Sequence, residues 1–130
     1  MSVDGGARGK VQDSWVPILS AAKTVSVTTT GIKLTYTVPA GKVARIANCQ
    51  ASATNGTLAT GAGVLRKNIV TGGNTYIVDT GTITASIAAL AETQADWYLA
   101  AGDQVTWEVQ PAFTTGNADF LISGEERLIE

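Results

Sequence analysis

The sequence predicts an all-β fold: a single antiparallel β-sandwich, jelly-roll-like, with about eight short strands. From residue 23 onward threonine, valine, alanine and glycine dominate, and short runs of alternating apolar and polar residues are separated by turn residues. The chain of 130 residues has the usual size of one domain. Because few of its apolar residues are large, we expect a thin core between two stacked sheets.

The first twenty residues differ from the rest, because glycines loosen the backbone and no alternation develops. We therefore predict an extended N-terminal arm at residues 1–20 and a sandwich domain at residues 21–130. The arm ends in an apolar group that is costly to leave in water. This group, which we expect to contact a partner, comprises Trp15, Val16, Pro17, Ile18 and Leu19. It folds back on its own sandwich or docks on another subunit; a short tail followed by an ordinary first strand is the alternative.

The strands are predicted from alternation and from the turn residues that bound it. Residues 24–28 and 33–38 each offer one apolar face. A longer strand is expected at residues 43–54, closed by the turn signal Asn-Gly at 55–56. A hairpin is expected over residues 64–78, around a Gly-Gly-Asn turn.

The remaining segments complete the predicted sheet. Residues 83–90 fit both strand and helix spacing, and we favour a strand because the neighbouring segments are β. Alternation at residues 105–109 predicts a half-buried strand with Trp107 facing the core, and residues 120–123 supply the last strand. Cys49 is expected to be a small buried residue of a central strand.

Two similar corners interrupt the strands. YTVPAGKV occupies residues 36–43, and a near repeat, YLAAGDQV, occupies residues 98–105. Proline cannot donate to a β-ladder, glycine accepts positive φ, and aspartate accepts hydrogen bonds from nearby backbone. We therefore predict tight corners between strands, formed by Pro39, Gly41, Gly102 and Asp103.

Composition excludes several classes of partner. The net charge of −2 offers no basic field for nucleic acid, and the apolar runs are much shorter than a membrane span of about 20 residues. Neither nucleic acid nor membrane is an expected partner. A single cysteine cannot form an internal disulfide, and the glycine-rich start lacks the apolar segment of a secretory signal.

No pattern of catalytic residues is present. The chain has no histidine, so the commonest general base and metal ligand is missing. Most aspartates and glutamates fall at predicted turns or on polar strand faces, which favours structural roles over a catalytic pair. Trp15, Trp97 and Trp107 could stack on a sugar, but their spacing favours core or subunit contacts. We expect a protein that is not an enzyme and binds no cofactor or metal.

The two corners also carry a resemblance. The Tyr-Thr-Val-Pro-Ala-Gly-Lys corner at residues 36–42, the segment at residues 97–105 and the Ile-Ser-Gly end at residues 122–124 resemble small β-sandwich virion proteins of tailed bacteriophages. The resemblance covers about residues 30–124, and its motifs form turns rather than an active site.

The resemblance implies a structural virion protein, most simply a capsid decoration or cement protein. Such a chain would be made in the host bacterial cytoplasm and would attach to major capsid or tail proteins as a homo-oligomer, for which we expect a trimer. The alternatives are a tail, neck or fibre accessory protein, or a module at the virion surface that binds a host glycan.

Overall fold

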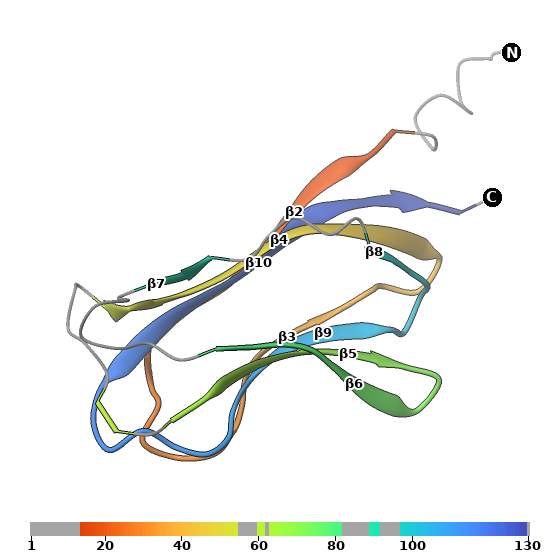
Figure 1. The fold of residues 1–130 in the computed structure, drawn as a ribbon. Coiled ribbons are helices and arrows are strands. Elements are labelled where there is room, and N and C mark those ends of the chain that lie inside the picture. The colour runs from red at the N-terminus through yellow and green to blue at the C-terminus, as the bar shows by residue number, and fades with distance from the viewer. Residues whose placement is uncertain (1–13, 55–59, 62, 82–88, 92–96, 130) are drawn as a thin grey trace, which may run out of the picture.

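The computed structural model describes residues 14–54, 60–61, 63–81, 89–91 and 97–129. Within these residues the chain forms antiparallel strands in two sheets that face each other, and no helix (Figure 1). The predicted all-β architecture is therefore confirmed. None of the described residues belongs to a helix that could pass through a lipid bilayer.

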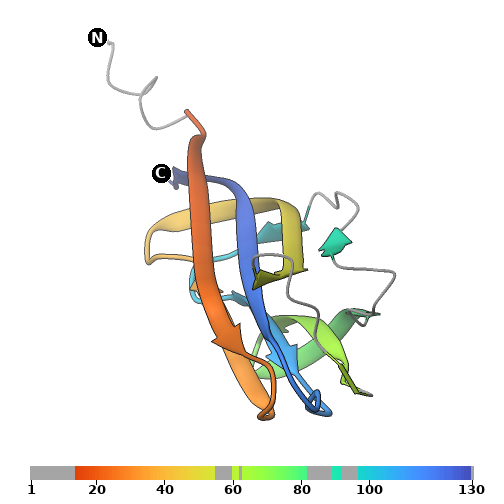
Figure 2. The ribbon, with the colours of Figure 1, turned by 90° about the vertical axis from the view of Figure 1, so that its left-hand side faces the viewer.

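The larger sheet has β10 at its centre. β10 (Asn117–Leu128) pairs with β2 (Val16–Ser26) on one side and with β4 (Lys42–Ala53) on the other. Two short strands, β7 (Ala89–Ala91) and β8 (Trp97–Leu99), pair with different parts of β4. The turned view shows β2 and β10 running side by side along the molecule (Figure 2).

The smaller sheet has the order β3-β9-β5-β6. Its strands are β3 (Gly31–Thr37), β9 (Gln104–Val109), β5 (Leu65–Thr71) and β6 (Asn74–Gly81). β5 and β6 form the predicted hairpin, with both glycines of its turn at positive φ. Among the described strands, β3 and β6 are the two edges of this sheet.

The start of the larger sheet corrects the predicted domain boundary. Val16 pairs with Glu126 and Leu19 pairs with Ser123, so residues 16–20 belong to β2 and not to an arm outside the sandwich. The boundary at residue 20 falls inside this strand. Alternation in this segment is interrupted by Pro17, which an edge strand tolerates. Residues 1–13 lie outside the described part of the chain.

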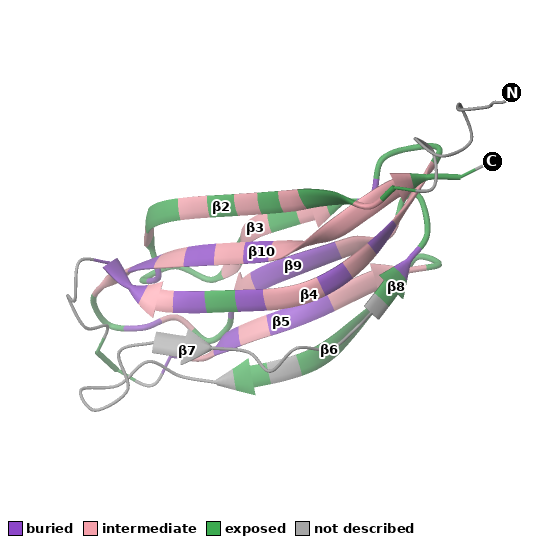
Figure 3. Cartoon of the chain, turned by 90° about the horizontal axis from the view of Figure 1, so that it is seen from above, coloured by how far each residue is buried: buried purple, intermediate pink, exposed green. Residues whose placement is uncertain are grey.

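The core lies between the sheets and is filled mainly by residues of the central strands (Figure 3). Trp107 of β9 packs against Phe120 of β10 with ring centroids 5.9 Å apart, and its Nε1 donates a 3.1 Å hydrogen bond to the carbonyl oxygen of Leu121. The inward orientation predicted for Trp107 is confirmed. Cys49 is buried in β4 between its neighbouring strands, also as predicted.

Other predicted segments have mixed outcomes. The strand expected at residues 43–54 is β4, and the one expected at residues 120–123 is the much longer β10. The Asn-Gly turn at residues 55–56 and most of the segment 83–90 lie outside the described residues; its last two residues begin β7. β8, at residues 97–99, was not expected to be a strand.

Candidate interaction surface

The two similar corners meet at one end of the sandwich. The backbone N–H of Val38 donates to the carbonyl oxygen of Asp103, and the N–H of Gly102 donates to the carbonyl oxygen of Val38, both at 2.9 Å. The chain end joins them, because the N–H of Ile129 donates to the carbonyl oxygen of Gly41 at 2.9 Å. We call this region, where β2 begins and β10 ends, the terminal end.

The predicted turn residues form these corners. Gly41 has a φ of +77° and Gly102 a φ of +89°, values that side chains disfavour. The carbonyl oxygen of Pro39 accepts a 3.2 Å bond from the next strand's first N–H. The carboxylate of Asp103 accepts a 3.0 Å hydrogen bond from the N–H of Ala100, so its predicted turn role is confirmed.

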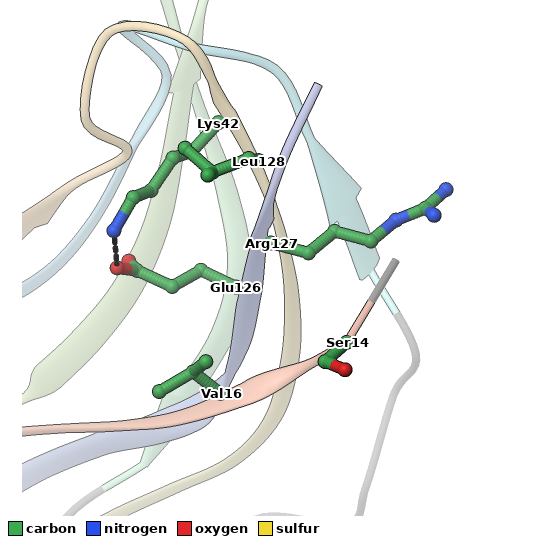
Figure 4. A pocket seen from close by; sticks show the side chains of 6 residues that line it. All are labelled: Ser14, Val16, Lys42, Glu126, Arg127 and Leu128. Carbon is green, nitrogen blue, oxygen red and sulfur yellow. Dashed lines mark hydrogen bonds and ion pairs between the residues drawn. The ribbon is translucent and has the colours of Figure 1, made fainter. Parts of the chain in front are cut away.

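Beside the corners, three polar side chains connect the sheets. Glu126 at the end of β10 accepts a 2.6 Å hydrogen bond from the Tyr36 hydroxyl of β3. It also accepts a 2.7 Å bond from Nζ of Lys42 in β4 (Figure 4). We call these residues the clasp. The bond from Lys42, followed by that from Tyr36, lowers the pKa of Glu126. Burial, followed by the adjacent Glu126, raises the pKa of Tyr36.

A hollow of about 190 Å³ lies beside the clasp. Its lining residues are Ser14, Val16, Lys42, Glu126, Arg127 and Leu128. Figure 4 shows Glu126 and Arg127 pointing to opposite sides of β10. Val16 and Leu128 are exposed at the hollow, and Ile129, which follows directly, is exposed too. The terminal end therefore combines exposed apolar side chains with a fixed ion pair.

An aromatic cluster occupies the other side of the same end. The ring of Trp15 meets Tyr98 edge-on at 6.5 Å, and the guanidinium groups of Arg45 and Arg127 lie 4.8 and 5.1 Å from its centroid. Arg45 also pairs with Glu125. These cation–π contacts fix Trp15 against β4 and β10 of its own chain.

The predicted partner-contact residues are thus divided between different surroundings. Trp15 packs on its own chain, and Ile18 packs against the core. Val16 and Pro17 are exposed near the terminal end, whereas Leu19, 74% exposed, lies further along β2. Val16, Pro17 and Leu19 are therefore accessible to a partner on the edge strand β2. No alternation develops in this segment, so its sequence does not indicate which side chains face the core.

The tryptophans do not assemble into one described platform. Trp107 is buried in the core and Trp15 is held by two arginines. The backbone of Trp97 belongs to β8, but its side chain lies outside the described residues. Among the described side chains of this end, Tyr98, 64% exposed, is a large aromatic side chain open to solvent.

The carboxylates that the structure describes each have a structural partner. Glu125 and Glu126 bind the basic residues named above, and Glu108 accepts a 3.0 Å bond from Asn68. Asp119 accepts 2.8 Å bonds from the N–H of Thr24 and the hydroxyl of Thr54, which lower its pKa in that order. No group of three or more histidines, cysteines, aspartates and glutamates in the described residues is placed to hold a metal ion.

Comparison with known proteins adds no family. No protein-family model matches the chain, and no curated protein sequence matches it significantly. The terminal end, where exposed apolar side chains and the two corners meet, is therefore the feature from which we infer a function.

Proposed function

We propose that this chain is a structural protein of a tailed bacteriophage particle, with a jelly-roll-like sandwich that attaches to the particle and stabilises it as a capsid decoration or cement protein. One observation carries the proposal. The two corners that resemble those of small virion proteins lie hydrogen-bonded together, at the end where exposed apolar side chains gather. The structural use of each described carboxylate supports a role that is not enzymatic.

Attachment at the terminal end has a physical basis. Burying Val16, Leu128 and Ile129 against a partner removes apolar surface from water. Because each is only about half exposed, each contributes about half of the roughly 1.5–3 kcal/mol that full burial of a large side chain gives. The neighbouring Lys42–Glu126 pair stays at the rim, where charges contribute orientation more than affinity. Partners of this kind are the major capsid or tail proteins.

In this proposal the protein resides in the virion after synthesis in the bacterial cytoplasm, and it acts as a homo-oligomer. The trimer expected from the sequence stays a prediction. Attachment as a tail, neck or fibre accessory protein would use the same surface and differs only in the partner.

The experiment compares particles with and without the protein. Phage carrying a deletion of the gene is purified, tested for loss of DNA on heating, and incubated with purified protein. Wild-type protein should bind to saturation and restore heat resistance. Absence of the protein from purified wild-type particles would overturn the proposal.

Two variants locate the attachment surface. The double variant Val16→Asp and Leu128→Asp places charges at the terminal end and should lower particle affinity at least about 100-fold, because both charges must lose water on docking. Leu19 lies on the same strand as Val16 and is more exposed, at 74% against 57%, so Leu19→Asp is the control and should bind like the wild type. Deleting residues 1–20 is a poorer test, because it removes part of β2 from the sheet. Equal binding by the wild type, the double variant and Leu19→Asp would exclude the terminal end as the attachment surface.

The exposed ring of Tyr98 is the observation that supports the host-glycan alternative. Its exposed ring beside Trp15 and Arg45 has the residue types that stack on sugars. If the protein binds a cell-surface glycan on an array, Tyr98→Ala should abolish binding while leaving particle attachment intact. An array without any bound glycan removes this alternative.

A further inference from the structure

β6 exposes three large apolar side chains in succession. Tyr76 is 52% exposed, Ile77 53% and Val78 37%. Tyr76 lies opposite Ile69, whereas Ile77 lies opposite Asn68, so the two point to opposite faces of the sheet. The register shift in this pairing leaves Val78 without an opposite residue on β5. The strand therefore presents apolar surface on both faces of the sheet.

β6 is also an edge strand without the usual protective residues. Among the described strands it pairs with β5 alone. Edge strands commonly carry proline or lysine, which discourage pairing with another chain. β2 contains Pro17 and Lys23, and β3 contains Lys33, whereas β6 contains neither residue type. Its sequence, NTYIVDTG, has a single charge, that of Asp79.

We propose that β6 is a self-association edge, at which β6 of one copy pairs antiparallel with β6 of a second copy. This deepens the homo-oligomer proposed above, but it needs no particle to be tested. The contact is isologous, so each copy contributes the same surface and the product is a two-fold dimer. A trimer would need another surface.

The strand is complementary to itself in a register centred on Ile77. Ile77 then lies opposite its own copy, and Tyr76 lies opposite Val78, an aromatic and β-branched pair of the kind that stabilises sheets. Asp79 lies two positions from the centre on each copy, so the two Asp79 residues stand on opposite sides of Ile77 along the paired strands and are not opposite each other. A second copy supplies the same exposed apolar side chains, Tyr76, Ile77 and Val78, so apolar surface meets apolar surface along the pair.

The first test uses two isoleucines at opposite edges of the same sheet. Ile77 and Ile32 are 53% and 58% exposed, and register places both on the face opposite the core. Light scattering after size-exclusion chromatography should give the wild type twice the chain mass of 13.4 kDa. Ile77→Lys should weaken the dimer at least about 100-fold, because two ammonium groups would meet. Ile32→Lys should leave the dimer unchanged.

The second test is a cross-link, which reports the register even where a lysine lowers stability. Opposite residues of antiparallel strands have Cα atoms about 4.5–5.5 Å apart, within the range of a disulfide. Ile77→Cys should therefore give a covalent dimer under mild oxidation. Ile32→Cys should stay unlinked, and the native Cys49 is buried and does not compete.

A monomeric wild type at about 1 mM, or a mass that Ile77→Lys leaves unchanged, would overturn the pairing. Dissociation by Ile32→Lys in place of Ile77→Lys would do the same and would point to β3. A monomer that still binds particles overturns this inference and the proposed homo-oligomer, and leaves the proposed attachment to the particle intact. A β6 dimer that binds no particle supports this inference and contradicts the proposed attachment to the particle.

Discussion

The Tyr36 hydroxyl donates a 2.6 Å hydrogen bond to Oε2 of Glu126, across the two sheets of the sandwich. Tyr36 belongs to β3 of the smaller sheet, and Glu126 belongs to β10 of the larger sheet. Lys42 balances the charge of the carboxylate from the corner that leads into β4. The clasp thus joins three strands at the surface that we propose for attachment, and its strength decides how well that surface is held together.

We predict that Tyr36→Phe lowers the free energy of unfolding by about 1–2 kcal/mol, because a hydrogen bond to an ionised and partly buried carboxylate is lost. The measurement is urea unfolding at pH 7, followed by tryptophan fluorescence, to which the buried Trp107 contributes. Tyr76→Phe is the matched control, because it removes only an exposed hydroxyl on β6 and keeps the ring that we propose to pair with Val78; it should change stability by less than about 0.5 kcal/mol. Equal effects of the two substitutions would show that the clasp contributes nothing.

Acid should weaken the same clasp. The pKa of Glu126 is lower in the folded chain than in the unfolded chain, where glutamate titrates near about 4.3. A lowered pKa means that the ionised group stabilises the fold above the unfolded pKa, and that this stability is lost as pH falls through the folded pKa. The stability difference between wild type and Glu126→Gln should therefore be greatest near neutral pH and shrink below about pH 4.

Unfolding measured from pH 7 to pH 3 checks this prediction. Asp119, whose pKa is also lowered, contributes with the same sign, so both proteins lose stability in acid, but the wild type loses more. A difference that stays constant over the whole range would mean that the charge of Glu126 does not matter. Asp119→Asn, measured alongside, separates the two contributions.

Local patterns in the sequence predict both corners and most of the described strands, though not β8 or the start of β2, because alternation and turn residues act over a few positions. Pro39 and Gly102 could be assigned to turns from their backbone chemistry alone. The pairing of β2 with β10 could not be found, because alternation indicates a buried face without naming the partner strand. For the same reason the link between Tyr36 and Glu126, far apart in sequence, left no local sign.

We predict that Gly102→Ala lowers the free energy of unfolding by about 1–2 kcal/mol through backbone conformation alone. Gly102 has a φ of +89°, and a Cβ at this position would meet no atom within 4 Å. Asparagine tolerates positive φ better than alanine, so Gly102→Asn should cost less. Urea unfolding of both variants provides the measurement. A larger loss for Asn than for Ala would show that crowding and not conformation is responsible.

Gly124 tests the opposite case, a glycine required by close packing. Its φ is not in the positive region, but a Cβ here would overlap the carbonyl oxygen of Arg45 on the neighbouring strand. The residue lies at the register shift between β10 and β4, where the two backbones approach each other. We predict that Gly124→Ala costs about 3 kcal/mol or more, above the loss for Gly102→Ala, because backbone must move.

The measurement for Gly124→Ala is urea unfolding, with the cross-strand pairing followed by amide hydrogen exchange. Faster exchange should be concentrated in β10 and β4 near the register shift, while the β5–β6 hairpin keeps the protection of the wild type. Failure of the variant to fold agrees with the prediction, because the overlap is with backbone that no side-chain rotation can relieve. A stability equal to the wild type would mean that the backbones of β10 and β4 do not approach each other closely at Gly124, and would contradict the prediction.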